Sequence, residues 1–160
     1  MPEILAVDPG PVQSAFVVLD TDTQTIPRKD ILPNKEMLEA ISLQVTLDID
    51  ILAIEMVESF GMPVGREVFE TVRWIGRFEE RFLDRGHNDP EVHLIPRRDV
   101  KIHLCNSARA KDPNIRQALI DRFGPVGTKA NPGRLYGFAR DLWSALAVAL
   151  TCADRMEAER

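Results

Sequence analysis

Short apolar runs in the first part of the chain predict β-strands. Residues 3–8 (EILAVD) end at a Pro-Gly pair, and residues 14–20 (SAFVVLD) end in a polar stretch. Apolar runs bounded by turn residues are typical of paired strands. A third strand is predicted over residues 25–32, where Pro27 favours an edge position. Because the connections are short, we expect these strands to form an antiparallel meander.

Helices alternate with strands after the meander. Asn34 is expected to cap a helix whose apolar residues recur at helical spacing, namely Met37, Leu38, Ile41 and Val45. Residues 51–55 (ILAIE) then predict a buried strand. After a glycine-bearing loop, a long helix is predicted to end near Gly86 and to present one apolar face, made of Val68, Phe69, Val72, Ile75, Phe78 and Phe82.

The last part of the chain predicts one more strand and three helices. The strand covers residues 92–95, and a helix follows over residues 96–104. Another helix opens at Asp112 and closes at Gly124. The final helix is predicted from about Leu135 onward. The fold class is therefore α/β, with a mixed five-stranded sheet (three antiparallel strands plus two parallel) flanked by helices.

Composition and length fit an ordinary globular domain. The 160 residues match one domain, residues 1–160, and the hydrophobic fraction of 44% is far from that of disordered chains. The sequence shows neither an apolar stretch that predicts a membrane helix nor a secretory signal, so we expect a cytoplasmic protein without a membrane partner. The cysteines and histidines lack zinc-site spacing.

The charge is unevenly distributed. The net charge is −5, yet residues 96–140 carry ten Lys and Arg against three Asp, a balance of +7, which leaves −12 for the rest. Such asymmetry is compatible with a basic surface that faces nucleic acid on an otherwise acidic protein. Ordinary solvated helix faces would give the same count.

Three acidic residues are candidates for a metal site. Asp8 and Glu55 each end an apolar strand, where an unpaired charge is costly unless it binds a cation. Asp141 lies on the predicted last helix, on the face that also carries Ala145 and Val148. The alternatives are that the first two are exposed strand ends and that Asp141 pairs with a nearby base, Arg134 or Arg140.

Several segments together resemble the RuvC family of Holliday-junction resolvases, in the ribonuclease-H-like superfamily. The segments ILAVDPG, LAIE, IPRRDVKIHLCNSARAKDPNIRQAL and RDLWSALAVAL occur in the family's order and cover nearly the whole chain. The stretch IEMVESFGMPVGREVFETVRWIGRF further resembles RuvC-like proteins common in phages and prophages.

The resemblance implies a metal-dependent endonuclease that cleaves branched DNA by two-metal phosphodiester hydrolysis. It implies that Asp8, Glu55 and Asp141 bind two Mg²⁺ or Mn²⁺ ions, and that the protein is a homodimer formed partly by the long helix. The bases expected to lie near DNA are Arg97, Arg98, Lys101, Arg109, Lys111, Lys129, Arg134 and Arg140. Of these, Lys111 is also expected to stabilise charge at the cleaved phosphate.

Two positions depart from the family pattern. Ser144 stands where the family has its fourth acid, and Glu58 stands where bacterial resolvases have an aromatic residue. One interpretation is that Glu58 supplies the missing carboxylate. Another is that three acids suffice, with water or Ser144 completing the metal shell.

Other functions stay open on sequence grounds. A non-catalytic, structure-selective DNA-binding protein with the same fold is one, because Ser144 replaces an acid. A ribonuclease-H-like nuclease for flaps, forks or RNA-DNA hybrids is another. Asp8, Gly10 and Ser14 loosely imitate the actin-type ATPase motif, but that architecture needs two domains and 160 residues cannot hold both.

Overall fold

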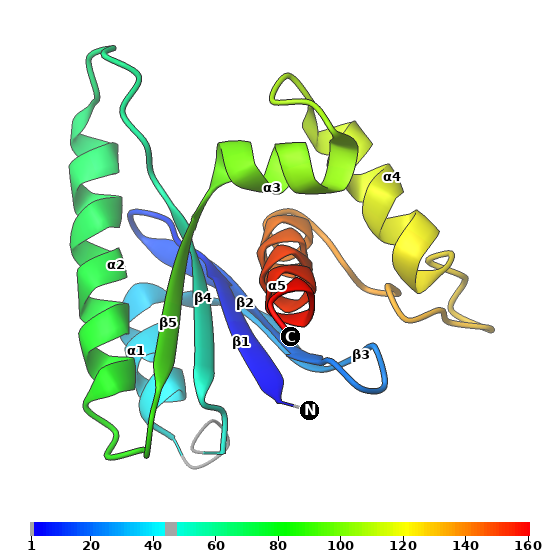
Figure 1. Ribbon diagram of the computed structural model, residues 1–160, viewed down its shortest axis with the longest axis horizontal. Helices are drawn as coiled ribbons and strands as arrows, with labels where there is room; N and C mark the ends of the chain where they lie inside the picture. Colours follow the sequence, from blue (N-terminus) through cyan, green and yellow to red (C-terminus); the bar gives the residue numbers. More distant parts are fainter. Residues whose placement is uncertain (1, 44–47) are drawn as a thin grey trace.

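The computed structural model describes residues 2–43 and 48–160, which form one sheet and the helices around it (Figure 1). In chain order the elements are β1 (Glu3–Asp8), β2 (Gln13–Asp20), β3 (Thr25–Pro33), α1 (Asn34–Ser42), β4 (Ile51–Met56), α2 (Arg66–Leu83), β5 (Glu91–Pro96), α3 (Arg97–Cys105), α4 (Asp112–Phe123) and α5 (Leu142–Ala158). Among these residues, no helix is long and apolar enough to cross a membrane.

The sheet is mixed, as the order of predicted elements indicates. Its strand order is β3-β2-β1-β4-β5. The pairs β1 with β2 and β2 with β3 are antiparallel, whereas β4 pairs in parallel with both β1 and β5. Pro27 lies on the edge strand β3, where its missing N–H costs no sheet hydrogen bond. The predicted strand arrangement is therefore confirmed.

The two faces of the sheet contact different helices. In β1, Ile4 and Ala6 belong to the core on the α5 side, whereas Leu5 and Val7 belong to the core on the α1 and α2 side. This alternation follows from the two-residue period of a strand. Since β1 is buried on both faces, all four residues are less than 2% exposed. The end residues of β1, Glu3 and Asp8, are half-buried.

The apolar face predicted for α2 is too wide. Its buried residues are Thr71, Ile75, Phe78 and Phe82. A helix turns by about 100° per residue, so Phe69 points away from that face, and Val72 lies at its border. Phe69 is 60% exposed and Val72 is 39% exposed. The prediction that both face the core is wrong, because it grouped positions that span more than one side of the helix.

The last helix begins later than the sequence pattern predicts. It starts at Leu142 instead of near Leu135, although Leu135 itself is fully buried. Gly137 and Arg140 have positive φ angles of 83° and 49°, which right-handed helices do not accommodate. The segment that precedes the helix is therefore a series of turns, and the predicted start is wrong.

Asn34 does not cap α1 through its side chain, so the predicted cap is wrong. Its Oδ1 accepts a hydrogen bond of 2.6 Å from the Ser14 hydroxyl, and its Nδ2 donates one of 2.9 Å to the Gly10 carbonyl. The Gly10 N–H in turn donates to the Ser14 hydroxyl at 3.2 Å. The side chain thus stabilises the β1–β2 turn. Val45, predicted on the same helix, lies outside the described residues.

Replacing Asn34 should reduce stability through this turn. Asn34→Ala is expected to lower the free energy of unfolding by about 1–3 kcal/mol, because the buried Ser14 hydroxyl and the Gly10 carbonyl lose a partner. Urea denaturation followed by circular dichroism measures the change. The exposed Asn88 provides a control, since Asn88→Ala should stay within about 0.5 kcal/mol of the parent. Equal effects of the two substitutions would contradict the proposed role of the turn.

Candidate active site

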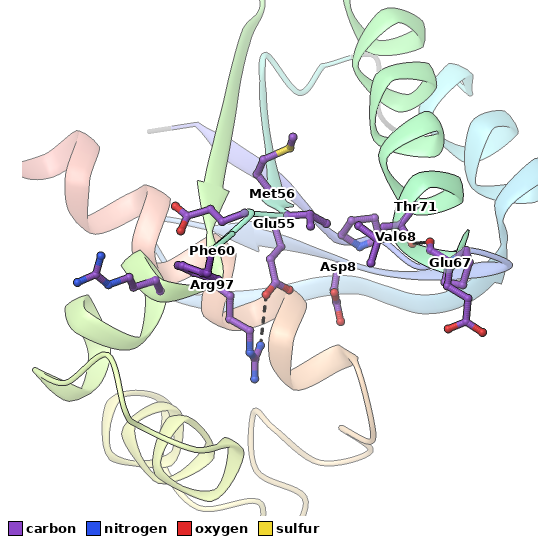
Figure 2. Close-up of a pocket in the computed structure, with 13 residues that line it drawn as sticks. Asp8, Glu55, Met56, Phe60, Glu67, Val68, Thr71 and Arg97 are labelled. Atoms are coloured by element: carbon purple, nitrogen blue, oxygen red, sulfur yellow. Dashed lines mark hydrogen bonds and ion pairs between the residues drawn. The ribbon is translucent and has the colours of Figure 1, made fainter. Parts of the chain in front are cut away.

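Two carboxylates meet at one end of the sheet. The parallel strands β1 and β4 pair with Val7 opposite Ile54. Asp8 and Glu55 are the next residues on each strand, and their carboxylates point into the same space (Figure 2). The sheet register therefore brings together the two strand-end acids predicted from the sequence.

The turn that follows Asp8 is held tightly. A Cβ added at Gly10 would lie 2.4 Å from the carbonyl oxygen of Gln13, so the chain requires glycine at this close approach. The hydrogen bonds of Asn34 and Ser14 hold the same turn from the α1 side. The position of Asp8 thus depends on residues as far along the chain as α1, a dependence that the sequence analysis missed.

The surroundings of Asp8 strongly perturb its ionisation. The pKa of Asp8 is raised from 3.8 to about 9, first by burial and then by the charge of Glu55, a hydrogen bond with Glu55 and the charge of Asp141, while Arg97 opposes the shift. Two carboxylates that share a poorly hydrated site cannot both be charged without a cation. Asp8 therefore holds a proton at neutral pH until a cation replaces it.

Arg97 is the base that pairs with this site. Its guanidinium donates to Glu55 Oε1 at 3.3 Å and also to the Asp112 carboxylate. Burial by itself lowers the pKa of Arg97, but the Glu55 and Asp112 carboxylates raise it above its ordinary value. Arg97 was predicted to contact the DNA backbone. In the structure this side chain links the end of β4 to the start of α4, and its contact with DNA stays a prediction.

Two cavities lie on either side of this pairing. The first, of about 440 Å³, is lined by Asp8, Glu55 and the exposed Glu58, together with apolar residues of the loop before α2. The second, of about 180 Å³, is lined by Asp141 and Ser144. Arg97 lines both. The predicted carboxylates of the metal site are therefore divided between two cavities, and Arg97 lies in the wall of both.

Asp141 is the N-cap of α5, so it lies immediately before the helix and one turn before Ala145. Its backbone carbonyl accepts a hydrogen bond of 3.0 Å from the Ala145 N–H, while its side chain is exposed. The Trp143 ring fixes this end of α5, because it lies 5.5 Å from the Phe138 ring and 5.0 Å from the Arg116 guanidinium. Asp141 is still close enough to Asp8 to influence its ionisation.

The donor set suits a hard divalent cation without being fully assembled. Carboxylate oxygens are the ligands that Mg²⁺ and Mn²⁺ prefer, and the half-buried pair of Asp8 and Glu55 needs a compensating positive charge. Within residues 2–43 and 48–160, however, no group of three His, Cys, Asp or Glu side chains is arranged to hold a metal ion. The assignment of Asp8, Glu55 and Asp141 as metal ligands therefore stays a prediction.

Most of the bases predicted to contact DNA are accessible. Six of the eight are exposed, namely Arg98, Arg109, Lys111, Lys129, Arg134 and Arg140. The other two, Arg97 and Lys101, are half-buried. Lys111 immediately precedes α4, where its backbone N–H donates to the Asn114 side chain at 2.9 Å. Six of these charges are thus free to approach a polyanion.

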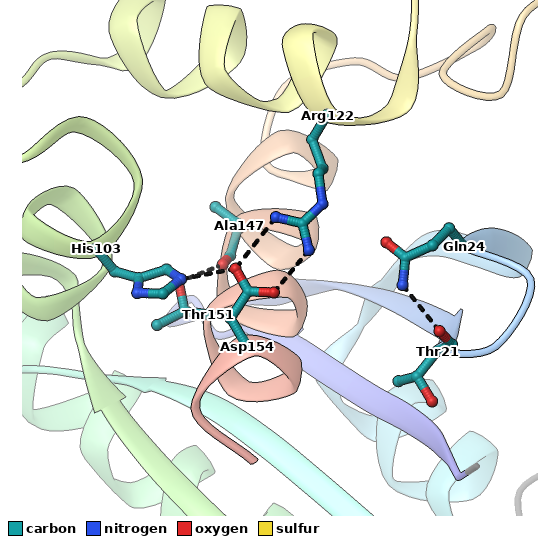
Figure 3. A network of polar contacts seen from close by, with 7 residues as sticks. All are labelled: Thr21, Gln24, His103, Arg122, Ala147, Thr151 and Asp154. Carbon is teal, nitrogen blue, oxygen red and sulfur yellow. Dashed lines mark hydrogen bonds and ion pairs between the residues drawn. The ribbon is translucent and has the colours of Figure 1, made fainter. Parts of the chain in front are cut away.

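Ion pairs fasten α3, α4 and α5 together on the same face of the sheet (Figure 3). Asp154 on α5 contacts His103 Nε2 of α3 and Arg122 Nη2 of α4, each at 2.8 Å. Arg155 pairs with Asp99 of α3 at 3.0 Å. The sequence analysis missed these contacts, because the partners are 32 to 56 residues apart and no local pattern marks them.

Comparison with known proteins supports the fold. No protein-family model matches the sequence, and no curated protein matches it either. Among solved structures, RuvC from Thermus thermophilus superposes with a TM-score of 0.69 at 18% identity, over 97% of this chain and 96% of that one. T. thermophilus RuvC in complex with Holliday junction substrate superposes with a TM-score of 0.67 at 19% identity, over 98% and 97%.

The chain therefore has a RuvC-like fold. The predicted fold class, a ribonuclease-H-like α/β fold with a mixed five-stranded sheet flanked by helices, is confirmed. At this level of identity the likeness shows the fold, and activity has to be argued from the site.

The raised pKa of Asp8 predicts an unusual dependence of stability on pH. Its folded-state pKa of about 9 lies above the unfolded value of 3.8, so its stabilising contribution is complete below pH 3.8 and is lost as the pH rises toward 9. Asp8→Asn removes this loss. In EDTA at pH 8 the variant should be more stable than the parent by at least about 1 kcal/mol, and the gap should shrink toward pH 5.

Thermal denaturation at the two pH values measures the difference, and Asp20 provides a control of opposite sign. Hydrogen bonds from the backbone N–H groups of Thr23 and Asp22 lower the pKa of Asp20, so its contribution is present at neutral pH and is lost as the pH falls. Asp20→Asn should therefore not stabilise the protein at pH 8. A constant gap between Asp8→Asn and the parent across pH 5 to 8 would contradict the assignment.

Proposed function

We propose that this chain is a metal-dependent endonuclease that acts on branched DNA, of the Holliday-junction-resolving type. The observation that carries the proposal is the carboxylate pair of Asp8 and Glu55, half-buried at the ends of two parallel strands and in need of a cation. The fold likeness to a RuvC that was solved with Holliday junction substrate supports the choice of DNA structure. The phage-type assignment rests on sequence resemblance alone.

In this proposal Asp8 and Glu55 bind the metal from the two strand ends, and Asp141 completes the site from the start of α5. Two bound Mg²⁺ or Mn²⁺ ions would supply an activated water and stabilise the leaving oxygen. Lys111, immediately before α4, and Lys101, in the middle of α3, would contribute positive charge beside the cleaved phosphate.

The DNA surface of the proposal consists of one exposed base at the start of α3 and the exposed bases in the loops that flank α4. These bases would contact mainly DNA phosphates, which favours recognition of DNA shape over sequence. The exposed bases are Arg98, Arg109, Lys111, Lys129, Arg134 and Arg140. Binding should accordingly weaken as the salt concentration rises.

We further propose that residues 1–160 form a single nuclease domain and that two copies assemble as a homodimer. Exposed apolar side chains around α2 support an interface there, because Phe60 is 68% exposed and Phe69 is 60% exposed. A two-fold dimer would present two sites to a junction that has two-fold symmetry itself.

A non-catalytic DNA-binding protein is the second candidate, and a specific observation favours it. Ser144 lines the cavity beside Asp141 where the resembled family has an acid, and the described residues contain no preassembled metal-ligand set. Both candidates bind branched DNA, so cleavage separates them.

Cleavage of a substrate panel tests the proposal. The panel contains labelled four-way junctions, flaps, forks, linear duplexes and RNA-DNA hybrids, each with Mg²⁺, with Mn²⁺ or with EDTA. We expect metal-dependent cutting of four-way junctions, and Asp8→Asn should reduce the rate at least ~100-fold while leaving junction binding intact, because the variant retains the basic surface. Binding without cutting would favour the non-catalytic protein, and cutting of RNA-DNA hybrids alone would rule out a resolvase.

The missing fourth acid calls for a separate test. If Glu58 substitutes for it, Glu58→Gln should lower the cleavage rate by about tenfold or more, because Glu58 lines the same cavity as Asp8 and Glu55. Glu36→Gln removes an exposed acid from α1 and serves as the control. A normal rate for Glu58→Gln together with a slow Ser144→Ala would instead support three acids assisted by the serine hydroxyl.

A further inference from the structure

Arg97 lies beside Glu55, at a position for which a bound metal ion would compete. Its guanidinium lies 3.3 Å from Glu55 Oε1, and the acids that influence its charge state also include Asp8. Figure 2 shows the guanidinium beside the two carboxylates. The arginine therefore supplies positive charge at the place where the proposed function needs a divalent cation.

A metal ion bound by Glu55 would compete with Arg97 for the same carboxylate. A guanidinium and a divalent ion on the same carboxylate repel each other strongly in a poorly hydrated site. Asp112 offers the arginine another partner, because it is exposed at the start of α4 and already accepts a hydrogen bond from the same side chain. Arg97 can thus leave Glu55 without losing its last ion pair.

The positions of the two cavities also favour withdrawal of the Arg97 side chain from Glu55. Arg97 lines both the space next to Asp8 and Glu55 and the space next to Asp141. Withdrawal of the side chain from this shared wall would join the two spaces and let Asp141 face the other acids.

We infer that Arg97 is a built-in competitor for the metal: its guanidinium neutralises Glu55 while no metal ion is bound, and it withdraws toward Asp112 when Glu55 becomes a metal ligand. This inference rests on the proposed function, since it presumes a metal at Asp8 and Glu55. Arg97 is in this role a positioning residue that sets the affinity of the site for metal.

Mn²⁺ binding to the DNA-free protein, measured by isothermal titration calorimetry at fixed pH, tests the inference without relying on cleavage. Arg97→Gln removes the competitor and should tighten Mn²⁺ binding by about tenfold, a change equivalent to ~1.4 kcal/mol. Asp112→Asn removes the alternative partner and should weaken Mn²⁺ binding several-fold. Asp8→Asn should abolish the binding, which assigns the measured heat to this site.

Matched variants control for net charge. Lys35→Gln removes an exposed base of α1, and Asp121→Asn removes an exposed acid of α4. Each should change the dissociation constant by less than about twofold, because screening weakens the influence of exposed charges. A purely structural link between β4 and α4 predicts a different pattern, since Arg97→Gln and Asp112→Asn would then change metal affinity in the same direction.

Unchanged or weaker Mn²⁺ binding by Arg97→Gln overturns the inference. If the parent still cuts branched DNA with Mn²⁺ in that case, the proposed function stands and only the role of Arg97 fails. If neither the parent nor Arg97→Gln binds Mn²⁺ at Asp8, both the metal-dependent function and the inference fail.

Discussion

The parallel pairing of β1 with β4 is the constraint on which the rest of the site depends. Its register sets Asp8 beside Glu55 at the end of a sheet that is buried on both faces. Two acids forced together in this way are costly unless positive charge reaches them. The proton on Asp8 and the guanidinium of Arg97 both reduce the repulsion between the two acids, and a metal ion would reduce it further.

The turn after Asp8 shows how stability and function are joined here. The Asn34 side chain forms hydrogen bonds with the Gly10 carbonyl and with Ser14, and it therefore does not cap its own helix, α1. A helix cap is worth about 1 kcal/mol, and a buried hydrogen-bonded network that fixes a turn is worth at least as much. Asn34 thus stabilises the end of β1 that carries Asp8 and not the start of α1.

Features encoded locally could be predicted from the sequence, and features set by distant contacts could not. The strands follow from apolar runs bounded by turn residues, and Asp8 and Glu55 follow from their place at the ends of those runs. The pairing of Arg97 with Asp112 and the start of α5 at Leu142 depend instead on tertiary packing and on the positive φ of Arg140. The same limit explains Asn34, whose sequence context is that of a helix cap while its partners lie 20 and 24 residues earlier.

The ion pairs that hold α3 against α5 affect how fast Arg97 can change its ion-pair partner. His103 and Asp99 tie this helix to α5, and Arg97 is its first residue. With the helix axis held, the arginine changes partner by rotating its own side chain and not by moving the backbone. Such rotations take on the order of nanoseconds for exposed residues, whereas helix shifts take microseconds or longer. Exchange of Arg97 for a metal ion at Glu55 would then require no movement of the α3 backbone.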